Sequence, residues 1–367
     1  MMSSTRRYWI TLTIVVVCMV GAAGSWLGGS AVAQGQPSTP VQQDQTVYLP
    51  LIASKPLQEI YLGVYFDPSA NTGTALQSFE RTFEKKHGIY HYYTYWGAGD
   101  FNWHKYILDQ VTGYGATPMI SFMSIPGPGN TGCGDTAWNL DSIISGSHDA
   151  YLTAFAQQAS RYRHDILLRW GHEMNLVEYS WSGFCNGGDL AATEKFVEAY
   201  RHIVDIFRQN NADNVHWIWS PNYQSSPEEA WNAIENYYPG DNYVDWIGVI
   251  GYNFGASRIE SGFQWMMFDA LFTAFLNNAA ALHPAKPVML ADYASTEADG
   301  GNKAEWITDA FEKMKDHPNL RAVVWFHKDP PEYSPPMTFA IDSSTASKAA
   351  YQSAIQDPAF ISDAPYE

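Results

Sequence analysis

The sequence has little positive charge and few cysteines. Its 367 residues include 21 lysines and arginines against 38 aspartates and glutamates, which gives a formal net charge of −17 at pH 7. A chain this acidic repels the phosphates of nucleic acids and the anionic surface of membranes, so we expect neither as a partner. Three cysteines are too few for a small disulfide-stapled fold, and the length is sufficient for one large domain.

Several common catalytic and cofactor motifs are also missing. No G-x-S-x-G sequence occurs, which argues against an α/β-hydrolase nucleophile. His172 and Glu173 open like the H-E-x-x-H motif of zinc proteases, but position 176 is leucine, and the cysteines lack metal-ligand spacing. We therefore expect no bound metal. Residues 127–132 match G-x-G-x-x-G, but Pro128 removes a backbone donor and no helical pattern follows, so we interpret them as a loop.

No apolar run in the sequence is long enough to be a convincing membrane anchor. The run at residues 10–20 is short and is followed by four glycines, so we favour a cleaved leader over a transmembrane helix. Arg6 and Arg7 precede it, and residues 31–33 form a small-x-small cleavage site. This pattern predicts a secretory signal peptide over residues 1–33 and a secreted protein that is free of the membrane after cleavage.

The rest of the chain alternates strand and helix patterns. Residues 34–57 are rich in Gln, Pro, Ser and Thr, and we interpret them as a linker before one domain at 58–360. Apolar runs of strand length occur at residues 60–67, 88–96, 117–124, 165–174, 215–222, 244–253, 286–295 and 321–329. Amphipathic helical patterns separate most of them, which indicates a parallel sheet covered by helices. Eight such units predict a closed (β/α)8 TIM barrel rather than an open doubly wound sheet.

Polar residues are concentrated where two of these strands end. Arg169, His172, Glu173 and Asn175 end the fourth strand, and Asp292 lies in the seventh. Functional residues of such barrels occupy the C-terminal strand ends, so these two carboxylates are expected to face each other across the mouth. Paired carboxylates cleave glycosidic bonds, one as acid and the other as nucleophile or base. The alternatives are a structural ion pair of Glu173 with Arg169, and a capping or solvated role for Asp292.

Aromatic residues make up 15% of the chain, and several lie at or beyond strand ends. Trp96, Trp219 and Trp325 occur at the second, fifth and eighth strands, and Trp181 follows the fourth. Aromatic faces match the C–H faces of sugar rings, so these tryptophans are candidate sugar-binding platforms, with core packing as the alternative. They also define a second hypothesis, in which the barrel binds a glycan through these four rings without cutting it.

The stretch LLRWGHEMN, residues 167–175, resembles the strand-4 signature of glycoside hydrolase family 26. That family contains endo-β-mannanases with some β-1,3-xylanases and mixed-linkage β-glucanases. Similar motifs follow in the same order, and the resemblance extends over about residues 60–330. It implies a (β/α)8 fold and retaining hydrolysis of a β-linked polysaccharide by two carboxylates, without a cofactor. We take β-1,4-mannan as the predicted substrate, with β-1,3-xylan and mixed-linkage β-glucan as alternatives, and expect a monomer.

The same resemblance implies roles for individual residues. Glu173 matches the general acid/base and Asp292 the nucleophile, which Arg169 supports and to which Tyr252 donates a hydrogen bond. His172 is implied to contact the sugar in the −1 subsite, and Trp325 to form the floor beneath it. The full set of predicted substrate-binding residues is Arg169, His172, Asn175, Tyr252, Trp96, Trp181, Trp219 and Trp325.

The nucleophile position departs from the family pattern, which has glutamate where this chain has Asp292. One fewer methylene draws the carboxylate back by about 1.5 Å, the length of a C–C bond. Three outcomes are open: a retaining enzyme with an adjusted backbone, a shift towards water activation, or a weakened site that still binds glycan. Glu297 is a candidate substitute carboxylate, for which a solvated loop acid is the simpler interpretation.

Two cysteines remain after the predicted signal peptide. Cys133 follows the third strand and Cys185 follows the fourth, so adjacent loops on the same face carry them. In an oxidising compartment such a pair is more often bridged than free, although two unpaired thiols remain the alternative. We predict a disulfide that stiffens the rim of the cleft and contributes about 2–4 kcal/mol.

Overall fold

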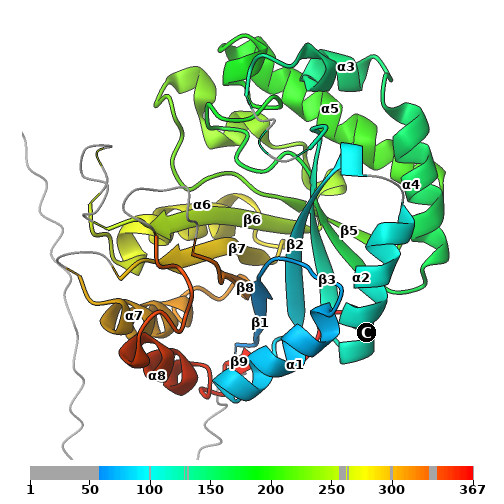
Figure 1. Ribbon diagram of the computed structural model, residues 1–367. Helices are drawn as coiled ribbons and strands as arrows, with labels where there is room; N and C mark the ends of the chain where they lie inside the picture. The colour runs from blue at the N-terminus through cyan, green and yellow to red at the C-terminus, as the bar shows by residue number, and fades with distance from the viewer. Residues whose placement is uncertain are drawn as a thin grey trace, which may run out of the picture. The chain divides into compact units, whose positions relative to one another are not determined.

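Eight parallel strands close into a barrel in the computed structural model (Figure 1). The described residues are 58–98, 101–127, 129, 132–255, 262, 264–297, 301–329 and 337–366. The strands are β1 (Ile60–Tyr65), β2 (Ile89–Tyr95), β3 (Thr117–Met123), β4 (Ile166–Arg169), β5 (Val215–Trp219), β6 (Trp246–Asn253), β7 (Val288–Ser295) and β8 (Leu320–Phe326). Each pairs with its neighbour in the chain, β8 pairs with β1, and the pairing of β1 with β2 closes the ring. The predicted eight-stranded TIM barrel is confirmed, whereas the predicted signal peptide and linker lie outside the described residues.

Helices surround this barrel and follow most of the strands (Figure 1). They are α1 (Thr72–Phe83), α2 (Phe101–Tyr114), α3 (Leu140–Ile144), α4 (Asp149–Arg161), α5 (Leu190–Gln209), α6 (Ala274–Leu282), α7 (Lys303–Met314) and α8 (Thr345–Ala354). Between β5 and β6, three short 3₁₀ helices replace the usual α-helix, at Ala230–Asn232, Ile234–Tyr237 and Asp241–Tyr243. No helix among the described residues is both long and apolar enough to cross a membrane.

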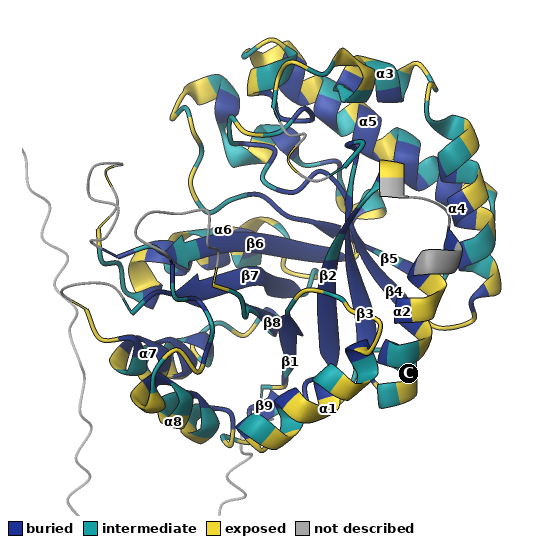
Figure 2. Cartoon of the chain, in the orientation of Figure 1, coloured by how far each residue is buried: buried dark blue, intermediate teal, exposed yellow. Residues whose placement is uncertain are grey.

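The strands separate two apolar cores because successive strand residues point to opposite faces. The larger core lies between the barrel and its helices, where α5 presents a buried apolar face (Figure 2). The smaller core fills the barrel itself and comprises Ile89, Met119, Leu167, Ile218, Trp246, Ile250, Met289, Ala291, Ala322 and Val324. Residues two positions beyond an inner-core residue therefore point towards the mouth of the barrel, as Arg169 does after Leu167.

The C-terminal segment packs at the end of the barrel where the strands begin. A ninth strand, β9 (Phe360–Ile361), pairs with β1, and the chain continues beyond it to Tyr366. The ring of Tyr366 stacks on His216 with centroids 3.7 Å apart, and its hydroxyl accepts a hydrogen bond from Trp246 Nε1 at 2.8 Å. The folded unit thus extends six residues beyond the predicted boundary at residue 360, and its last side chains cover the barrel interior.

We expect Tyr366→Ala to lower the free energy of unfolding by about 2 kcal/mol, because an aromatic ring leaves the apolar surface around Trp246. Tyr366→Phe should cost about 1 kcal/mol, since it removes only the partner of the buried indole N–H. Urea unfolding followed by tryptophan fluorescence measures both. Tyr106→Ala, at a 55% exposed tyrosine, is the control. An equal loss in all three variants would contradict a specific role for Tyr366.

Candidate active site

Glu173 follows β4 in a tight turn whose backbone is left-handed. Gly171 has φ +66° and Glu173 has φ +53°. A side chain at Gly171 would meet the Phe196 ring at 2.7 Å, so this turn needs glycine there. The Glu173 N–H donates to the carbonyl of Ser220, after β5, at 2.9 Å. A left-handed conformation is unfavourable for glutamate, and strain of this kind is typical of functional sites.

The carboxylate of Glu173 accepts two side-chain hydrogen bonds. Asn222 Nδ2 donates to Oε1 at 2.8 Å, and the Tyr179 hydroxyl donates to Oε2 at 3.0 Å. Burial raises the pKa of Glu173 above its ordinary value, although both hydrogen bonds act to lower it. Among the ionisable neighbours, Arg169 also acts to lower this pKa and Asp292 acts to raise it. The result is a carboxyl group whose pKa lies above its ordinary value, which is the direction that a general acid requires.

Asn175 supports this arrangement from beneath rather than facing a ligand. It is fully buried, its Oδ1 accepts from the Asn222 N–H at 2.9 Å, and its Nδ2 donates to the Asn222 carbonyl at 3.0 Å. These paired bonds hold Asn222 against Glu173. The predicted substrate contact of Asn175 is therefore wrong, because all of its side-chain groups are used within the protein to join the loops after β4 and β5.

Asp292 faces the barrel interior because β7 contains a bulge. From Leu290 to Asp292 the strand advances two residues while its neighbour β6 advances one, and β7 also gains one residue on β8 before Tyr293. Ala291 belongs to the inner core, and a regular strand would have turned Asp292 outward. Bulges re-aim side chains in this way and are common beside active sites.

The Asp292 carboxylate lies in a closed polar cradle. Arg169 Nη2 donates to Oδ2 at 2.5 Å, the Tyr93 hydroxyl donates to the same oxygen at 2.7 Å, and His91 Nδ1 lies 3.1 Å from Oδ1. The side chains of Asp292, Arg169 and His91 are 0% exposed. Burial acts to raise the pKa of Asp292, but Arg169 and His91 outweigh it, so the pKa lies well below its ordinary value. Asp292 is therefore ionised at neutral pH.

The hydrogen bonds around His91 fix which of its nitrogens carries the proton. Ser121 Oγ accepts from Arg169 Nε at 2.9 Å and lies 2.7 Å from His91 Nε2, to which its own hydroxyl can donate. Arg169 Nη2 also points at His91 Nε2, at 3.3 Å. With donors on Nε2, the proton of the neutral ring is placed on Nδ1, facing Asp292. Burial lowers the pKa of His91, which keeps this ring neutral.

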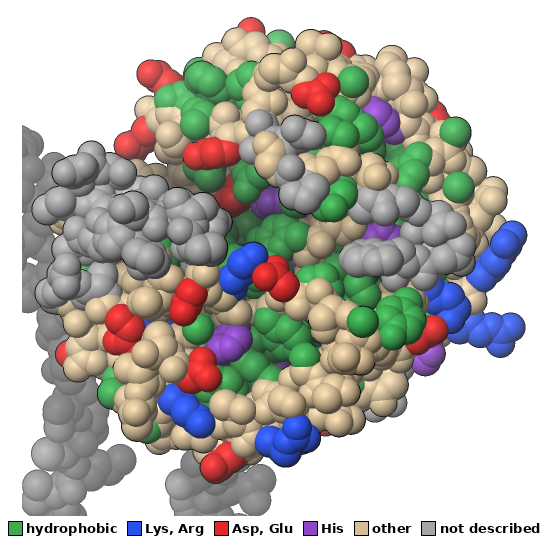
Figure 3. Space-filling model, in the orientation of Figure 1, with side chains coloured by type: hydrophobic (Ala, Val, Ile, Leu, Met, Phe, Trp, Pro, Cys, Tyr) green, Lys and Arg blue, Asp and Glu red, His purple; other side chains and the backbone are tan. Residues whose placement is uncertain are grey.

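Some side chains are influenced by the charges of both carboxyl groups, and others connect the surroundings of the two. Tyr252 is partly exposed on β6, and burial raises its pKa, as do the nearby charges of Asp292 and Glu173. The Tyr93 ring, bonded to Asp292, also packs edge-on against His172, with centroids 5.6 Å apart. Figure 3 shows a hollow near the middle of this face, with acidic and histidine side chains next to one another inside it. The pKa of Glu173 is raised and that of Asp292 is lowered, which suits acid–base chemistry.

The four predicted tryptophan platforms are wrong. Trp96 is 4% exposed, Trp219 is 3% exposed, and Trp181 and Trp325 are 0% exposed. Strand alternation explains the error at Trp325: Ala322 and Val324 face the barrel interior, so Trp325 points outward. Its indole donates to the Phe339 carbonyl at 2.8 Å and packs among the surrounding helices. The next residue, Phe326, is partly exposed and stacks on Tyr65 with centroids 4.5 Å apart.

Three further predicted residues take somewhat different roles. Arg169 supports Asp292 as predicted, but its complete burial excludes direct substrate contact. His172 is 2% exposed, and burial lowers its pKa well below the ordinary value, so the ring is neutral beside the cleft. Within the described residues, Tyr93 rather than Tyr252 donates a hydrogen bond to Asp292. Tyr252 instead stacks on Phe339 in the aromatic wall, with centroids 5.3 Å apart.

Sequence reasoning missed His91 and Tyr93, which hold Asp292, and did not include Asn222 and Tyr179 among the site residues. Strand alternation in residues 89–95, IYHYYTY, could have shown which of these side chains face the barrel interior. Ile89 begins this strand in the inner core, so His91 and Tyr93 share its inward face. A polar residue on an inward face near a strand end is expected to have a partner inside the barrel.

Glu297 is not paired with Glu173. Its carboxylate accepts from the Ser343 hydroxyl at 2.9 Å, and its N–H donates to Thr338 Oγ1 at 2.8 Å. These bonds join the loops after β7 and β8, so the substitute catalytic role is not supported and a structural role replaces it. Within the described ranges, no group of three or more His, Cys, Asp or Glu side chains is placed to hold a metal ion.

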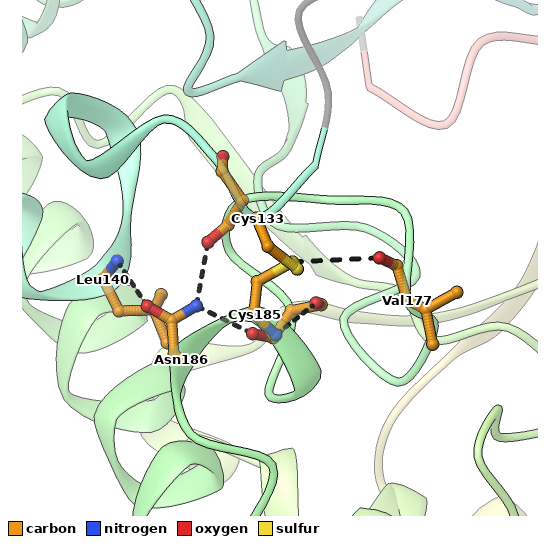
Figure 4. Close-up of a disulfide and its surroundings, with 7 residues drawn as sticks. Cys133, Leu140, Val177, Cys185 and Asn186 are labelled. Atoms are coloured by element: carbon orange, nitrogen blue, oxygen red, sulfur yellow. Dashed lines mark hydrogen bonds between the residues drawn. A yellow bond between two sulfur atoms is a disulfide. The ribbon is translucent and has the colours of Figure 1, made fainter.

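A disulfide joins Cys133 and Cys185, as predicted (Figure 4). Their Cα atoms are 4.6 Å apart, and the bond crosses from the loop after β3 to the loop after β4. Asn186 continues this link, because its Oδ1 accepts from the Leu140 N–H at 3.1 Å and its Nδ2 donates to the Ser180 carbonyl at 2.8 Å. The disulfide is therefore part of the framework beside the turn that carries Glu173 and Tyr179.

The chain is similar in sequence to known glycoside hydrolases. The sequence model of Glycosyl hydrolase family 26 matches residues 130–317. Endoglucanase H of Acetivibrio thermocellus is 34% identical over 284 residues, which is 77% of this chain and 29% of that protein. Beta-1,3-xylanase TXYA of Vibrio sp is 22% identical over 241 residues, 61% of this chain and 45% of that protein. The chain thus spans less than half the length of either curated relative.

Solved structures share the fold. An endo-β-1,4-mannanase double mutant from Cellulomonas fimi has a TM-score of 0.62 at 18% identity, covering 83% of this chain and 72% of that one. The GH26 β-mannanase BoMan26A of Bacteroides ovatus has a TM-score of 0.59 at 15% identity, covering 83% and 90%. At this level of identity the likeness supports the barrel architecture and leaves the substrate to other arguments.

We expect Arg169→Met to lower the free energy of unfolding by about 3–5 kcal/mol, because Asp292 is left buried without its cation. The double variant Arg169→Met/Asp292→Leu should recover part of that loss, since it removes the unpaired charge as well. Urea unfolding at pH 7 of the wild type, the two single variants Arg169→Met and Asp292→Leu, and the double variant gives the coupling energy. A double variant whose loss equals the sum of the two single losses would contradict the pairing.

Proposed function

The chain belongs to glycosyl hydrolase family 26, and on that premise we propose that it is a hydrolase of β-linked polysaccharide with β-glucan as its substrate. Support for glucan comes from the 34% identical relative, which is named an endoglucanase. The mannanase structures are less than 20% identical and support only the fold. The mannan substrate expected from the sequence remains the main competing candidate, and β-1,3-xylan is the other.

The observation that carries this proposal is that the pKa values of two carboxyl groups at one mouth of the barrel are shifted in opposite directions. Burial raises the pKa of Glu173, whereas Arg169 holds the pKa of Asp292 well below its ordinary value. An environment that raises the pKa of one carboxyl and lowers that of the other suits the acid and the anion that glycosidic cleavage requires. Hydrogen bonds from Asn222 and Tyr179 orient the acid, and the cradle of Arg169 orients the anion.

In the proposed retaining reaction, Glu173 gives its proton to the glycosidic oxygen as the bond to the anomeric carbon breaks. The Asp292 carboxylate attacks the anomeric carbon from the opposite face as that bond breaks, which forms a covalent glycosyl-enzyme intermediate. Water then attacks the anomeric carbon from the side of Glu173, which accepts a proton from it, while the bond to Asp292 breaks and the site returns to its starting state. Tyr252 and Phe326, both partly exposed, supply apolar ring surface for the sugar.

The alternative of a non-catalytic glycan-binding barrel has weaker support. It depended on Trp96, Trp181, Trp219 and Trp325 as stacking surfaces, and all four are buried. The hydrogen bonds to Glu173 and the pairing of Asp292 Oδ2 with Arg169 instead favour a working site. We also propose secretion, on the basis of the leader pattern in residues 1–33 and the disulfide between Cys133 and Cys185, a bond typical of oxidising compartments.

Reducing-end release from mixed-linkage β-glucan, β-1,4-mannan and β-1,3-xylan tests the proposed function. We expect the wild type to act on β-glucan, and Glu173→Gln to lower the rate by about 10²–10⁴-fold, because the amide cannot donate the acid proton. Glu178→Gln, at a nearby exposed glutamate, is the control and should leave the rate unchanged. Release from mannan alone would overturn the substrate, and full activity in Glu173→Gln would overturn the role of this residue.

The pH profile of kcat/KM gives a second prediction. Glu173 must be protonated to act as the acid, so activity falls as pH rises through its pKa. The hydrogen bonds from Asn222 and Tyr179 stabilise the charged form, so Asn222→Ala and Tyr179→Phe should each raise this pKa further. The alkaline limb should therefore move to higher pH in both variants and stay in place in Gln224→Ala, a change at the exposed residue nearby. Movement to lower pH would contradict the assignment.

A further inference from the structure

Lys303 is a buried cation that the proposed reaction does not use. It is the first residue of α7 and is 0% exposed. A lysine at this position carries two costs, because burial removes water from its ammonium group and the N-terminal end of a helix has a partial positive charge that disfavours a cation. An apolar side chain of similar length would avoid both costs. A role for the lysine therefore has to lie in the contacts of its ammonium group.

The ammonium group of Lys303 binds the segment of residues 337–344, which precedes α8. Its Nζ donates to the carbonyl of Thr338 at 2.6 Å, to the carbonyl of Ala340 at 2.5 Å and to Ser343 Oγ at 2.9 Å. An ammonium group has three N–H donors, so all of them are used within the protein. An apolar residue at this position would leave these acceptors without their donor.

Phe339 lies between the two carbonyls that Lys303 binds. Its own carbonyl accepts from Trp325 Nε1 at 2.8 Å. Residues 337–344 lie in neither a helix nor a strand, so no ladder of backbone hydrogen bonds fixes their shape. Three successive carbonyls of this segment are instead fixed by two buried side chains, one from α7 and one from β8. The backbone position of Phe339 therefore depends on Lys303.

Three acidic residues partly offset the burial of this cation. The charges of Glu297, Asp329 and Asp342 act to raise the pKa of Lys303, but burial outweighs them and lowers this pKa to about 7. Ser343 connects the cation to the first of these acids, because its hydroxyl accepts from Lys303 and donates to Glu297 Oε1 at 2.9 Å. At pH 6 the group is therefore mainly in the charged form that makes all three hydrogen bonds.

The ring of Phe339 supports the aromatic wall of the candidate cleft, which it forms with Tyr252 and Phe326. It stacks on Tyr252 with centroids 5.3 Å apart and packs edge-on against Phe326 with centroids 6.3 Å apart. Phe339 is only 2% exposed, whereas the other two rings are partly exposed. Those two rings are the proposed apolar surface for the sugar, so their position depends on the buried ring that they pack against.

We propose that Lys303 is a positioning residue for glycan binding: it fixes the backbone at Phe339, whose ring supports the two rings that face the sugar. This role rests on the proposed function and adds to it a residue outside the cleft. The ammonium group itself does not contact the sugar, because it is buried and its three donors are used. Loss of Lys303 should accordingly weaken sugar binding more than it slows bond cleavage, which depends on Glu173 and Asp292.

Steady-state kinetics of Lys303→Met test this role. The full chain is assayed at pH 6 with a tetrasaccharide of mixed-linkage β-glucan, or of β-1,4-mannan or β-1,3-xylan if the wild type cleaves that glycan instead. We expect KM to rise about three- to tenfold while kcat changes by less than about twofold, because an interaction common to substrate and transition state is weakened. An unchanged KM in a folded Lys303→Met protein would overturn the proposal.

Lys313→Met is the matched control, at a partly exposed lysine on the same helix whose Nζ lies 3.0 Å from Asp269. Its KM should equal that of the wild type, and an equal rise in KM in both lysine variants would overturn the specific role of Lys303. Circular dichroism melts establish that each variant is folded. A wild type that releases no sugar from any of the three glycans would instead overturn the proposed function itself.

Phe339→Leu tests the connection between Lys303 and the aromatic wall, and it does so even if Lys303→Met does not fold. It removes the supporting ring without touching the cation, so KM should rise to a similar extent. In the double variant Lys303→Met/Phe339→Leu, KM should rise little further, because the two residues act in series. A Phe339→Leu enzyme with the KM of the wild type, or a double variant in which the two effects multiply in full, would overturn the proposal.

Discussion

The buried pair of Arg169 and Asp292 is the interaction on which the rest of the site depends. Both side chains are 0% exposed, and isolated charges at that depth are very costly, so each residue requires the other. Arg169 also donates to Ser121, which orders His91, and to Tyr93. Strands β2, β3, β4 and β7 are thereby joined by one hydrogen-bonded network inside the barrel. The charge of Asp292 in turn contributes to the raised pKa of Glu173 across the mouth.

Much of the fold was predictable because it depends on repeated, local patterns. The eight apolar runs match the eight strands, and the loops that carry Cys133 and Cys185 do lie together. Strand-end chemistry was also predictable, since Arg169, Glu173 and Asp292 occupy one end of the barrel as parallel strands require. The missing helix between β5 and β6 had no comparably clear signal, because short 3₁₀ turns leave little periodicity in a sequence.

The orientation of individual side chains was harder to predict, for two physical reasons. Alternation along a strand decides whether a ring faces the barrel mouth or the helices, and on β8 it buries Trp325 among the helices while the next residue, Phe326, is partly exposed. A bulge then reverses that alternation locally, so counting along β7 would have pointed Asp292 away from the cleft. The cradle of His91 and Tyr93 forms only when distant strands meet, and no local pattern in the chain encodes that meeting.

The left-handed backbone at Glu173 has a consequence for how this protein responds to selection. At φ +53° a glutamate is strained, whereas glycine adopts this conformation freely, so replacing Glu173 by glycine would relieve backbone strain while removing the acceptor of the hydrogen bonds from Asn222 and Tyr179. Selection for heat tolerance alone does not preserve the proposed acid, because only the proposed catalysis requires a carboxyl group at residue 173. Backbone stability and the proposed activity thus place opposing demands on residue 173. Stabilising substitutions in this protein are therefore better sought at other positions.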